Sequence, residues 1–148
     1  MPVDVLTEIV IARPRAEVAA FAADPDNATA WYENIKGVEW RTTPPLAVGS
    51  RIAFVALFLG RRVEYTYEVR EHVAGEIFVM STAEGPFPME TTYAWEDAGE
   101  GATRMTLRNR GEPSGFSKVG APLVSGAMRR ANAKDLRRLK QVLEGRDP

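Results

Sequence analysis

The chain has 148 residues, 45% of them hydrophobic, and a formal net charge of −1. This length predicts one domain over residues 1–148, and the absence of cysteine excludes disulfides, thiolate zinc sites and cysteine nucleophiles. The longest apolar run, residues 52–59, is too short to span a bilayer, and no charged-then-apolar leader precedes it, so we expect a cytoplasmic protein with no integral membrane association.

The first part of the chain predicts a strand followed by two short helices. Residues 3–12 alternate between two faces, as a strand does. A short helix is expected over residues 16–23. Asp24 and Pro25 then start a second helix that extends to about residue 32, with Asp24 as its N-cap and Pro25 in its first turn.

The clearest hairpin joins residues 51–59 to residues 62–73 through a two-residue turn whose first member is Gly60. That turn would pair Phe58 with Val63. One face of this hairpin is aromatic and apolar and the other is mixed, as expected for an antiparallel sheet that is covered on one side.

Four more strands complete a predicted sheet of seven. They are expected at residues 38–42, 77–82, 89–96 and 103–110. The last two would form a hairpin that places Glu96 opposite Arg104 and Glu90 opposite Arg110. Such cross-strand pairs contribute about 0.2–1 kcal/mol each and are no sign of a catalytic site.

Apolar residues near the C-terminus recur at helical spacing and predict about 20 residues of helix from Pro122 onward. The predicted stripe consists of Phe116, Val119, Leu123, Ala127, Ala131, Leu136, Leu139 and Leu143. We expect a kink near residues 119–122. Because such a helix is not stable alone, its stripe must lie on the curved sheet.

The charge is divided unevenly along the chain. Residues 113–148 carry eight Lys/Arg and three Asp/Glu, whereas residues 1–112 carry a net charge of −6. A basic helix can serve as a nucleic-acid, acidic-lipid or protein surface. Because no aromatic residues stand between its basic ones to stack bases, we expect a solvated helix and no nucleic-acid partner. A homodimer is left open.

Several segments resemble the START-like helix-grip superfamily (SRPBCC), in particular its polyketide cyclase/dehydrase and lipid transport family. They are RPRAEVAAFAADPDNATAWY, VGSRIAF, EYTYEVREHVAGEIF, GPFPMETTYAWEDAGEGATRMTLRNRGEP and RRANAKDLRRLKQVLE. The resemblance implies an α+β helix-grip fold, in which a curved antiparallel seven-stranded sheet wraps around a long C-terminal helix. It also implies a cavity between sheet and helix for a small hydrophobic or amphipathic ligand. We expect no cofactor.

The aromatic face of the predicted sheet agrees with such a cavity, although the same rings could simply fill the core. The residues expected to contact the ligand are Trp31, Phe54, Phe58, Tyr65, Tyr67, Phe87, Met89, Thr91, Tyr93, Leu123 and Ala127. Two entrances are expected, one at residues 85–88 with Phe87 as a gate, and one beside Trp31 and Tyr32.

No catalytic constellation is evident. The single histidine, His72, alternates onto the face of Glu68 and Arg70, so we expect it at the surface and expect no metal site. If the protein is an enzyme, it resembles the cyclases, with Tyr65, Tyr67, Thr91 and Tyr93 positioning a polyketone and Asn109 near the rim. The alternatives are therefore a binding, transport or sequestration protein, a polyketide cyclase or dehydratase, and a non-catalytic stress or co-chaperone-like accessory protein.

Overall fold

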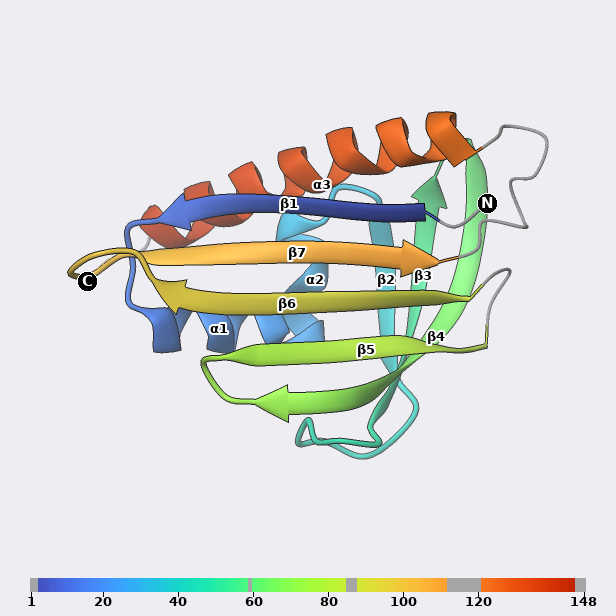
Figure 1. Ribbon diagram of the computed structural model, residues 1–148. Helices are drawn as coiled ribbons and strands as arrows, with labels where there is room; N and C mark the ends of the chain where they lie inside the picture. The colour runs from blue at the N-terminus through green and yellow to red at the C-terminus, as the bar shows by residue number, and fades with distance from the viewer. Residues whose placement is uncertain (1–2, 59, 85–87, 112–120, 146–148) are drawn as a thin grey trace.

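The computed structural model describes residues 3–58, 60–84, 88–111 and 121–145. Seven strands form one antiparallel sheet in the order β1-β7-β6-β5-β4-β3-β2, and the helices lie behind it in Figure 1. The elements are β1 (Val3–Ile11), α1 (Arg15–Ala23), the 3₁₀ helix η1 (Pro25–Asn27), α2 (Ala28–Trp31), β2 (Ile35–Trp40), β3 (Arg51–Phe58), β4 (Arg61–Val73), β5 (Ile77–Glu84), β6 (Met89–Asp97), β7 (Thr103–Gly111) and α3 (Ala121–Glu144). The predicted fold class is confirmed.

The short helices after β1 begin where the sequence predicts. The Asp24 carboxylate accepts a hydrogen bond from the Asp26 backbone N–H at 3.0 Å, and Pro25 occupies the first turn of η1. Proline is tolerated there because its missing N–H would have no partner within the helix. α1 buries small residues, including Val18 and Ala22, so it packs closely against the sheet.

The β3–β4 hairpin has a different register from the predicted one. Val63 pairs with Ala56 rather than with Phe58, and Phe58 pairs with Arg61. Gly60 has a φ of 76°, a left-handed conformation that glycine adopts without strain. The tight turn therefore lies one residue earlier than expected. The pairing shifts by two residues, which is one full side-chain period, so the described side chains keep their predicted faces.

A β-bulge in β4 reverses the predicted orientation of His72. The β4–β5 register shifts between Val69 and Glu71, and His72 then pairs with Phe78. Their rings meet edge to face, with centroids 5.4 Å apart. A bulge inserts one extra residue into a strand, so alternation counted from residues before it fails after it. His72 is accordingly half-buried beside Phe78 and does not share the face of Glu68.

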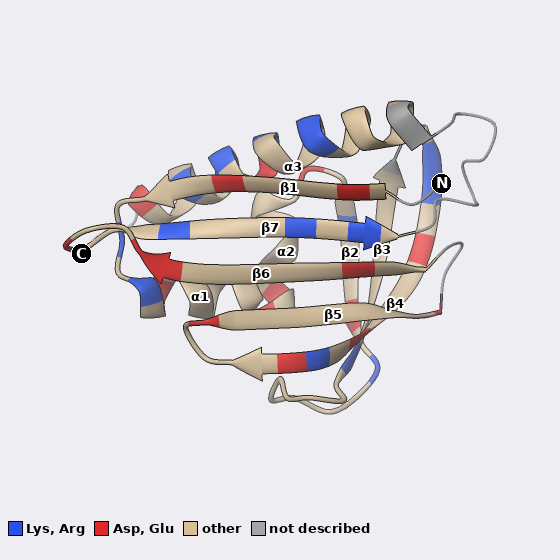
Figure 2. Ribbon diagram, in the orientation of Figure 1, with Lys and Arg blue, Asp and Glu red and all other residues tan. Residues whose placement is uncertain are grey.

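The convex face of the sheet is charged, as Figure 2 shows along β1, β7 and β6. The predicted β6–β7 register is confirmed, with Glu96 opposite Arg104 and Glu90 opposite Arg110. Arg104 and Glu96 form an ion pair at 3.1 Å, and Arg110 pairs with Glu90. These side chains are largely solvent-exposed, so the pairs add little stability and define the outer face.

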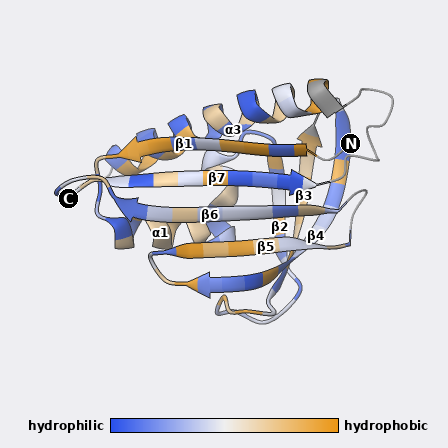
Figure 3. Cartoon of the chain, in the orientation of Figure 1, coloured by the Kyte–Doolittle hydropathy of each residue, from blue (hydrophilic) through white to orange (hydrophobic). Residues whose placement is uncertain are grey.

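α3 is amphipathic, and Figure 3 shows hydrophilic and hydrophobic stretches alternating along it. Its buried apolar residues are Val124, Met128, Leu136, Leu139 and Leu143. The predicted stripe is correct at its last three leucines and wrong at Leu123, which is 54% exposed, whereas Ala127 and Ala131 are both half-buried. The buried row runs in steps of four residues from Leu136 through Asn132 and Met128 to Val124. Because Asn132 is polar, this row is not recognisable as apolar from the sequence. Phe116, Val119 and the first half of the predicted kink lie outside the described residues.

The C-terminal half of α3 runs beside β1. The Lys140 ammonium donates to the Val10 carbonyl at 2.9 Å, and the Ala12 backbone N–H donates to the Glu144 carboxylate at 2.8 Å. α3 thus contacts the edge of the sheet at one end and lies over its concave face at the other.

Candidate functional site

A cavity of about 140 Å³ lies between the concave face of the sheet, α3 and the α1–α2 segment. Aromatic rings from the strands and from the end of α2 form much of its wall: Tyr32, Phe54, Tyr65, Tyr67, Phe78 and Tyr93. Small side chains such as Ala28, Ala56 and Ala131 stand among them. Large rings separated by small residues leave space that the core does not fill.

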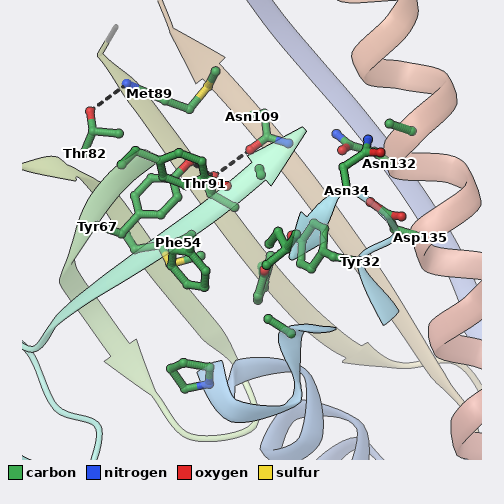
Figure 4. Close-up of a pocket in the computed structure, with 18 of the residues that line it drawn as sticks. Tyr32, Asn34, Phe54, Tyr67, Thr82, Met89, Thr91, Asn109, Asn132 and Asp135 are labelled. Atoms are coloured by element: carbon green, nitrogen blue, oxygen red, sulfur yellow. Dashed lines mark hydrogen bonds between the residues drawn. The ribbon is translucent and has the colours of Figure 1, made fainter. Parts of the chain in front are cut away.

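A chain of three buried polar side chains crosses the sheet wall of the cavity (Figure 4). The Thr91 hydroxyl donates to the Asn109 carbonyl at 2.6 Å, and its oxygen lies 2.8 Å from the Tyr67 hydroxyl. A hydroxyl has one proton, so Thr91 accepts from Tyr67. The Tyr67 oxygen keeps its acceptor capacity. Asn109, expected near the rim, is thereby a buried member of this chain.

A second contact joins the phenols of Tyr32 and Tyr93, whose oxygens lie 2.6 Å apart. Burial raises the pKa of Tyr67 to about 12 and the pKa of Tyr93 well above its ordinary value. Burial likewise raises the pKa of Tyr32 and of Tyr65. All four phenols are therefore neutral at physiological pH and act as hydrogen-bonding groups rather than as bases.

The α3 wall of the cavity carries a polar pair that the sequence-based predictions missed. Asn132 is 5% exposed and Asp135 is 3% exposed, and both line the cavity. The Asp135 carboxylate accepts a hydrogen bond from the Glu33 backbone N–H at 3.0 Å. No described residue accepts a hydrogen bond from the Asn132 amide nitrogen. A polar residue within the inner row of an amphipathic helix was the signal that could have revealed both.

The pKa of Asp135 is raised to about 6, chiefly because burial disfavours the charged carboxylate. The hydrogen bond from Glu33 and the positive charges of Arg138 and Lys134 lower this pKa, and the negative charge of Glu33 raises it. A carboxyl group with a pKa near the physiological range, placed on a cavity wall, is a candidate for a proton acceptor.

Of the residues predicted to contact the ligand, some line the cavity, some lie elsewhere, and two cannot be placed from the described residues. Those that line the cavity are Phe54, Tyr65, Tyr67, Met89, Thr91 and Tyr93. Trp31 does not line it, because its ring is fully buried against Tyr32, with centroids 4.1 Å apart. Leu123 and Ala127 do not line it either. Phe58 ends β3, and Phe87 lies outside the described residues, so their roles stay predictions.

Charge is sparse on the cavity wall. The described lining residues include two acids, Asp24 and Asp135, and no Lys, Arg or His. Within the described part of the chain, no group of three His, Cys, Asp or Glu residues is arranged to hold a metal ion. None of the described helices is long and apolar enough to cross a membrane.

The outward face of α3 carries exposed basic residues, among them Arg129 and Arg137. Others are paired: Lys134 contacts Glu33 at 2.8 Å, and Lys140 contacts Glu144 at 2.6 Å. Pairing of this kind is typical of a solvated helix surface. The accessory role at this face stays a prediction.

A curved antiparallel sheet that holds a long C-terminal helix over an aromatic cavity defines a helix-grip protein of the START-like class. Residues 2–144 match the family profile described as polyketide cyclase / dehydrase and lipid transport, and the chain belongs to this family. The comparison with curated proteins found no match.

Solved structures share this fold over nearly the whole chain. The protein TTHA0849 from Thermus thermophilus is 23% identical, with a TM-score of 0.82 over 97% of this chain and 99% of that one. The Zhui aromatase/cyclase from a Streptomyces species is 13% identical, with a TM-score of 0.80 over 97% and 94%. A major latex-like protein from Panax ginseng is 14% identical, with a TM-score of 0.75 over 95% and 97%. At these identities the likeness extends to the fold alone.

Proposed function

We propose that this protein binds a small hydrophobic or amphipathic molecule in the cavity between the sheet and α3, for transport or sequestration. The observation that carries this proposal is a cavity of about 140 Å³ with aromatic walls and a few convergent polar groups. An apolar cavity of about 150 Å³ engineered in another protein accommodates benzene. The space therefore suits a molecule of about one ring.

The proposal is tested with native mass spectrometry and displacement of a fluorescent apolar dye, using two matched substitutions on α3. Ala131 lines the cavity, whereas Ala127, one turn earlier, does not. Ala131→Leu should weaken dye binding about tenfold, because the larger side chain takes up part of the volume that the dye would occupy. Ala127→Leu should leave dye affinity unchanged. Leucine favours helix, so both variants should stay folded.

Two results would contradict the binding role. One is that the native protein takes up no dye or small apolar molecule. The other is that Ala127→Leu impairs binding as much as Ala131→Leu does, which would place the dye on the outside of α3.

A second candidate function is a cyclase or dehydratase, and the observation that favours it is Asp135. This buried carboxyl group lines the cavity, and its pKa of about 6 allows it to accept a proton near neutral pH. The phenol of Tyr67 belongs to the sheet wall of the cavity, and because its proton is donated to Thr91, its oxygen can orient a hydroxyl or enol group of the substrate. A cavity of about 140 Å³ would limit the substrate to a short polyketone.

Turnover of a short aromatic-forming polyketone analogue tests this candidate. Asp135→Asn should abolish the reaction if Asp135 accepts the proton. Tyr67→Phe combined with Tyr93→Phe should slow it. Unchanged turnover in both cases would exclude these residues from catalysis, and binding without any turnover would leave the carrier function alone.

A further inference from the structure

Two neighbouring polar groups on α3 line the cavity and can each form a hydrogen bond with a bound molecule. The Asn132 amide nitrogen is buried and has no partner among the described residues. Asp135 accepts a hydrogen bond from the Glu33 backbone N–H through one carboxylate oxygen, and the second oxygen of a carboxylate can accept further hydrogen bonds. Buried polar groups in folded proteins are nearly always satisfied, so the Asn132 nitrogen points to a group in the cavity that accepts a hydrogen bond from it, and Asp135 can accept a hydrogen bond from the same group.

The two groups are close enough to contact a single atom of a ligand. Residues three positions apart on a helix have Cβ atoms about 5–6 Å apart on the same face. Figure 4 shows both side chains reaching from α3 to the side of the cavity where Tyr32 lies. They offer one donor, the amide N–H, beside one acceptor, the carboxylate oxygen. A hydroxyl group matches this pair because it donates one hydrogen bond and accepts another.

A carboxylate, an ammonium group and a plain hydrocarbon each match Asn132 and Asp135 less well than a hydroxyl does. A carboxylate would meet no cation among the described lining residues and would lie against Asp135. An ammonium group would pair with Asp135, but it has no acceptor and would leave the Asn132 N–H unsatisfied. A plain hydrocarbon would form no hydrogen bond with either group.

We infer that the ligand is a neutral phenol or alcohol of about one ring, whose hydroxyl donates to Asp135 and accepts from the Asn132 amide. This inference rests on the proposed binding function and adds the chemical class of the ligand. The ring then extends from α3 toward the aromatic wall formed by Tyr32, Phe54 and Tyr67. α3 supplies the polar anchor, and the sheet supplies the apolar surface.

Four probes that share an ethylbenzene core and differ in the para substituent separate these chemistries. They are para-ethylphenol, ethylbenzene, para-ethylbenzoate and para-ethylbenzylamine. Each is titrated into the whole protein by calorimetry at about pH 8, where Asp135 is ionised. The phenol should bind about tenfold more tightly than ethylbenzene, because a hydrogen bond to a charged group adds that much affinity. The benzoate and the benzylamine should both bind more weakly than the phenol.

Two substitutions on α3 test whether Asp135 and Asn132 cause the preference for the phenol over ethylbenzene. Asp135→Asn keeps the size of the side chain and an acceptor for the Glu33 N–H but removes the charge. Asn132→Leu removes the amide. Each should reduce the affinity for the phenol toward that for ethylbenzene, without weakening ethylbenzene itself. Arg137→Gln, on the exposed face of the same helix, should change neither affinity.

The outcomes are distinguishable. Equal affinity for phenol and ethylbenzene, tightest binding of the amine or the benzoate, or a phenol preference that survives both substitutions would each overturn the hydroxyl inference while leaving a binding cavity. If none of the four probes binds the native protein, the binding function itself fails. Thermal melting of each variant verifies that a lost preference does not reflect unfolding.

Discussion

The Tyr32 hydroxyl lies 2.6 Å from the Tyr93 hydroxyl, which ties the chain just after α2 to the centre of β6. The Trp31 ring packs against both phenols, with its centroid 4.1 Å from that of Tyr32 and 5.7 Å from that of Tyr93. Trp31 is fully buried. This group of three rings fixes where the α1–α2 segment meets the sheet, and it therefore fixes the shape of the cavity wall beside it.

Removal of either phenol oxygen should destabilise the protein. Tyr32→Phe and Tyr93→Phe should each lower the free energy of unfolding by about 1 kcal/mol, because one hydrogen bond is lost. The double variant should lose little more than either single one, since both act on the same bond. Urea unfolding at neutral pH measures this. Additive losses would mean that the two hydroxyls stabilise the fold independently.

The Asp135 carboxyl should make stability depend on pH. Burial raises its pKa from 3.8 to about 6, so the folded state holds the proton more firmly than the unfolded state does. The free energy of unfolding should therefore fall as the pH rises from about 4 to about 6 and then stay level, with a total loss of about 2–3 kcal/mol.

Asp135→Asn should remove this loss while keeping an acceptor for the Glu33 N–H. The variant should be about 2 kcal/mol more stable than the native protein at about pH 8 and equally stable at about pH 4. Urea unfolding of both proteins at the two pH values gives the comparison. A difference that is the same at both pH values would show that the charge of Asp135 is not responsible.

Leucine-to-alanine substitutions at two positions test which face of α3 is buried. Leu139 is 0% exposed and Leu123 is 54% exposed. Leu139→Ala should lower the free energy of unfolding by about 2–5 kcal/mol, because it leaves a cavity in the core. Leu123→Ala should change it by less than about 0.5 kcal/mol. Comparable losses would place Leu123 in the core, as the sequence-based stripe did.

Thr91 should be essential to the polar chain on the sheet wall. Thr91→Val should lower the free energy of unfolding by about 2 kcal/mol, because Tyr67 loses its acceptor and the buried Asn109 carbonyl loses its donor. Thr92→Val is the matched control, since adjacent strand residues face opposite sides of the sheet. Denaturant unfolding of both variants should separate them clearly. Equal effects would argue against the hydrogen-bonded chain.

Much of the sheet could be predicted because strand alternation is a local property. The β6–β7 register was correct, since opposite charges such as Glu96 and Arg104 mark it directly. The β3–β4 register was wrong by two residues. Either turn position keeps Gly60 in the loop and the strand residues on the same faces, so the pattern of apolar residues does not distinguish them. The bulge that turns His72 inward has no marker in the sequence.

The candidate site was predictable on the sheet and not on the helix. Phe54, Tyr67 and Tyr93 follow the strand alternation, so their position facing α3 could be read from it. The α3 wall depends on the phase of one helix, and the predicted apolar stripe contained neither Asn132 nor Asp135. These two polar residues of the cavity were therefore missed.

The contacts between α3 and β1 cover backbone groups at one edge of the sheet. β1 is a terminal strand of the sheet, and the backbone groups of such a strand can template pairing with another chain. The Val10 carbonyl accepts a hydrogen bond from Lys140, and the Ala12 N–H donates one to Glu144, so neither group is free to pair with another strand. A chain that lost the final turns of α3 would therefore expose a strand end ready to recruit a second copy, and it would be prone to fibrous aggregation.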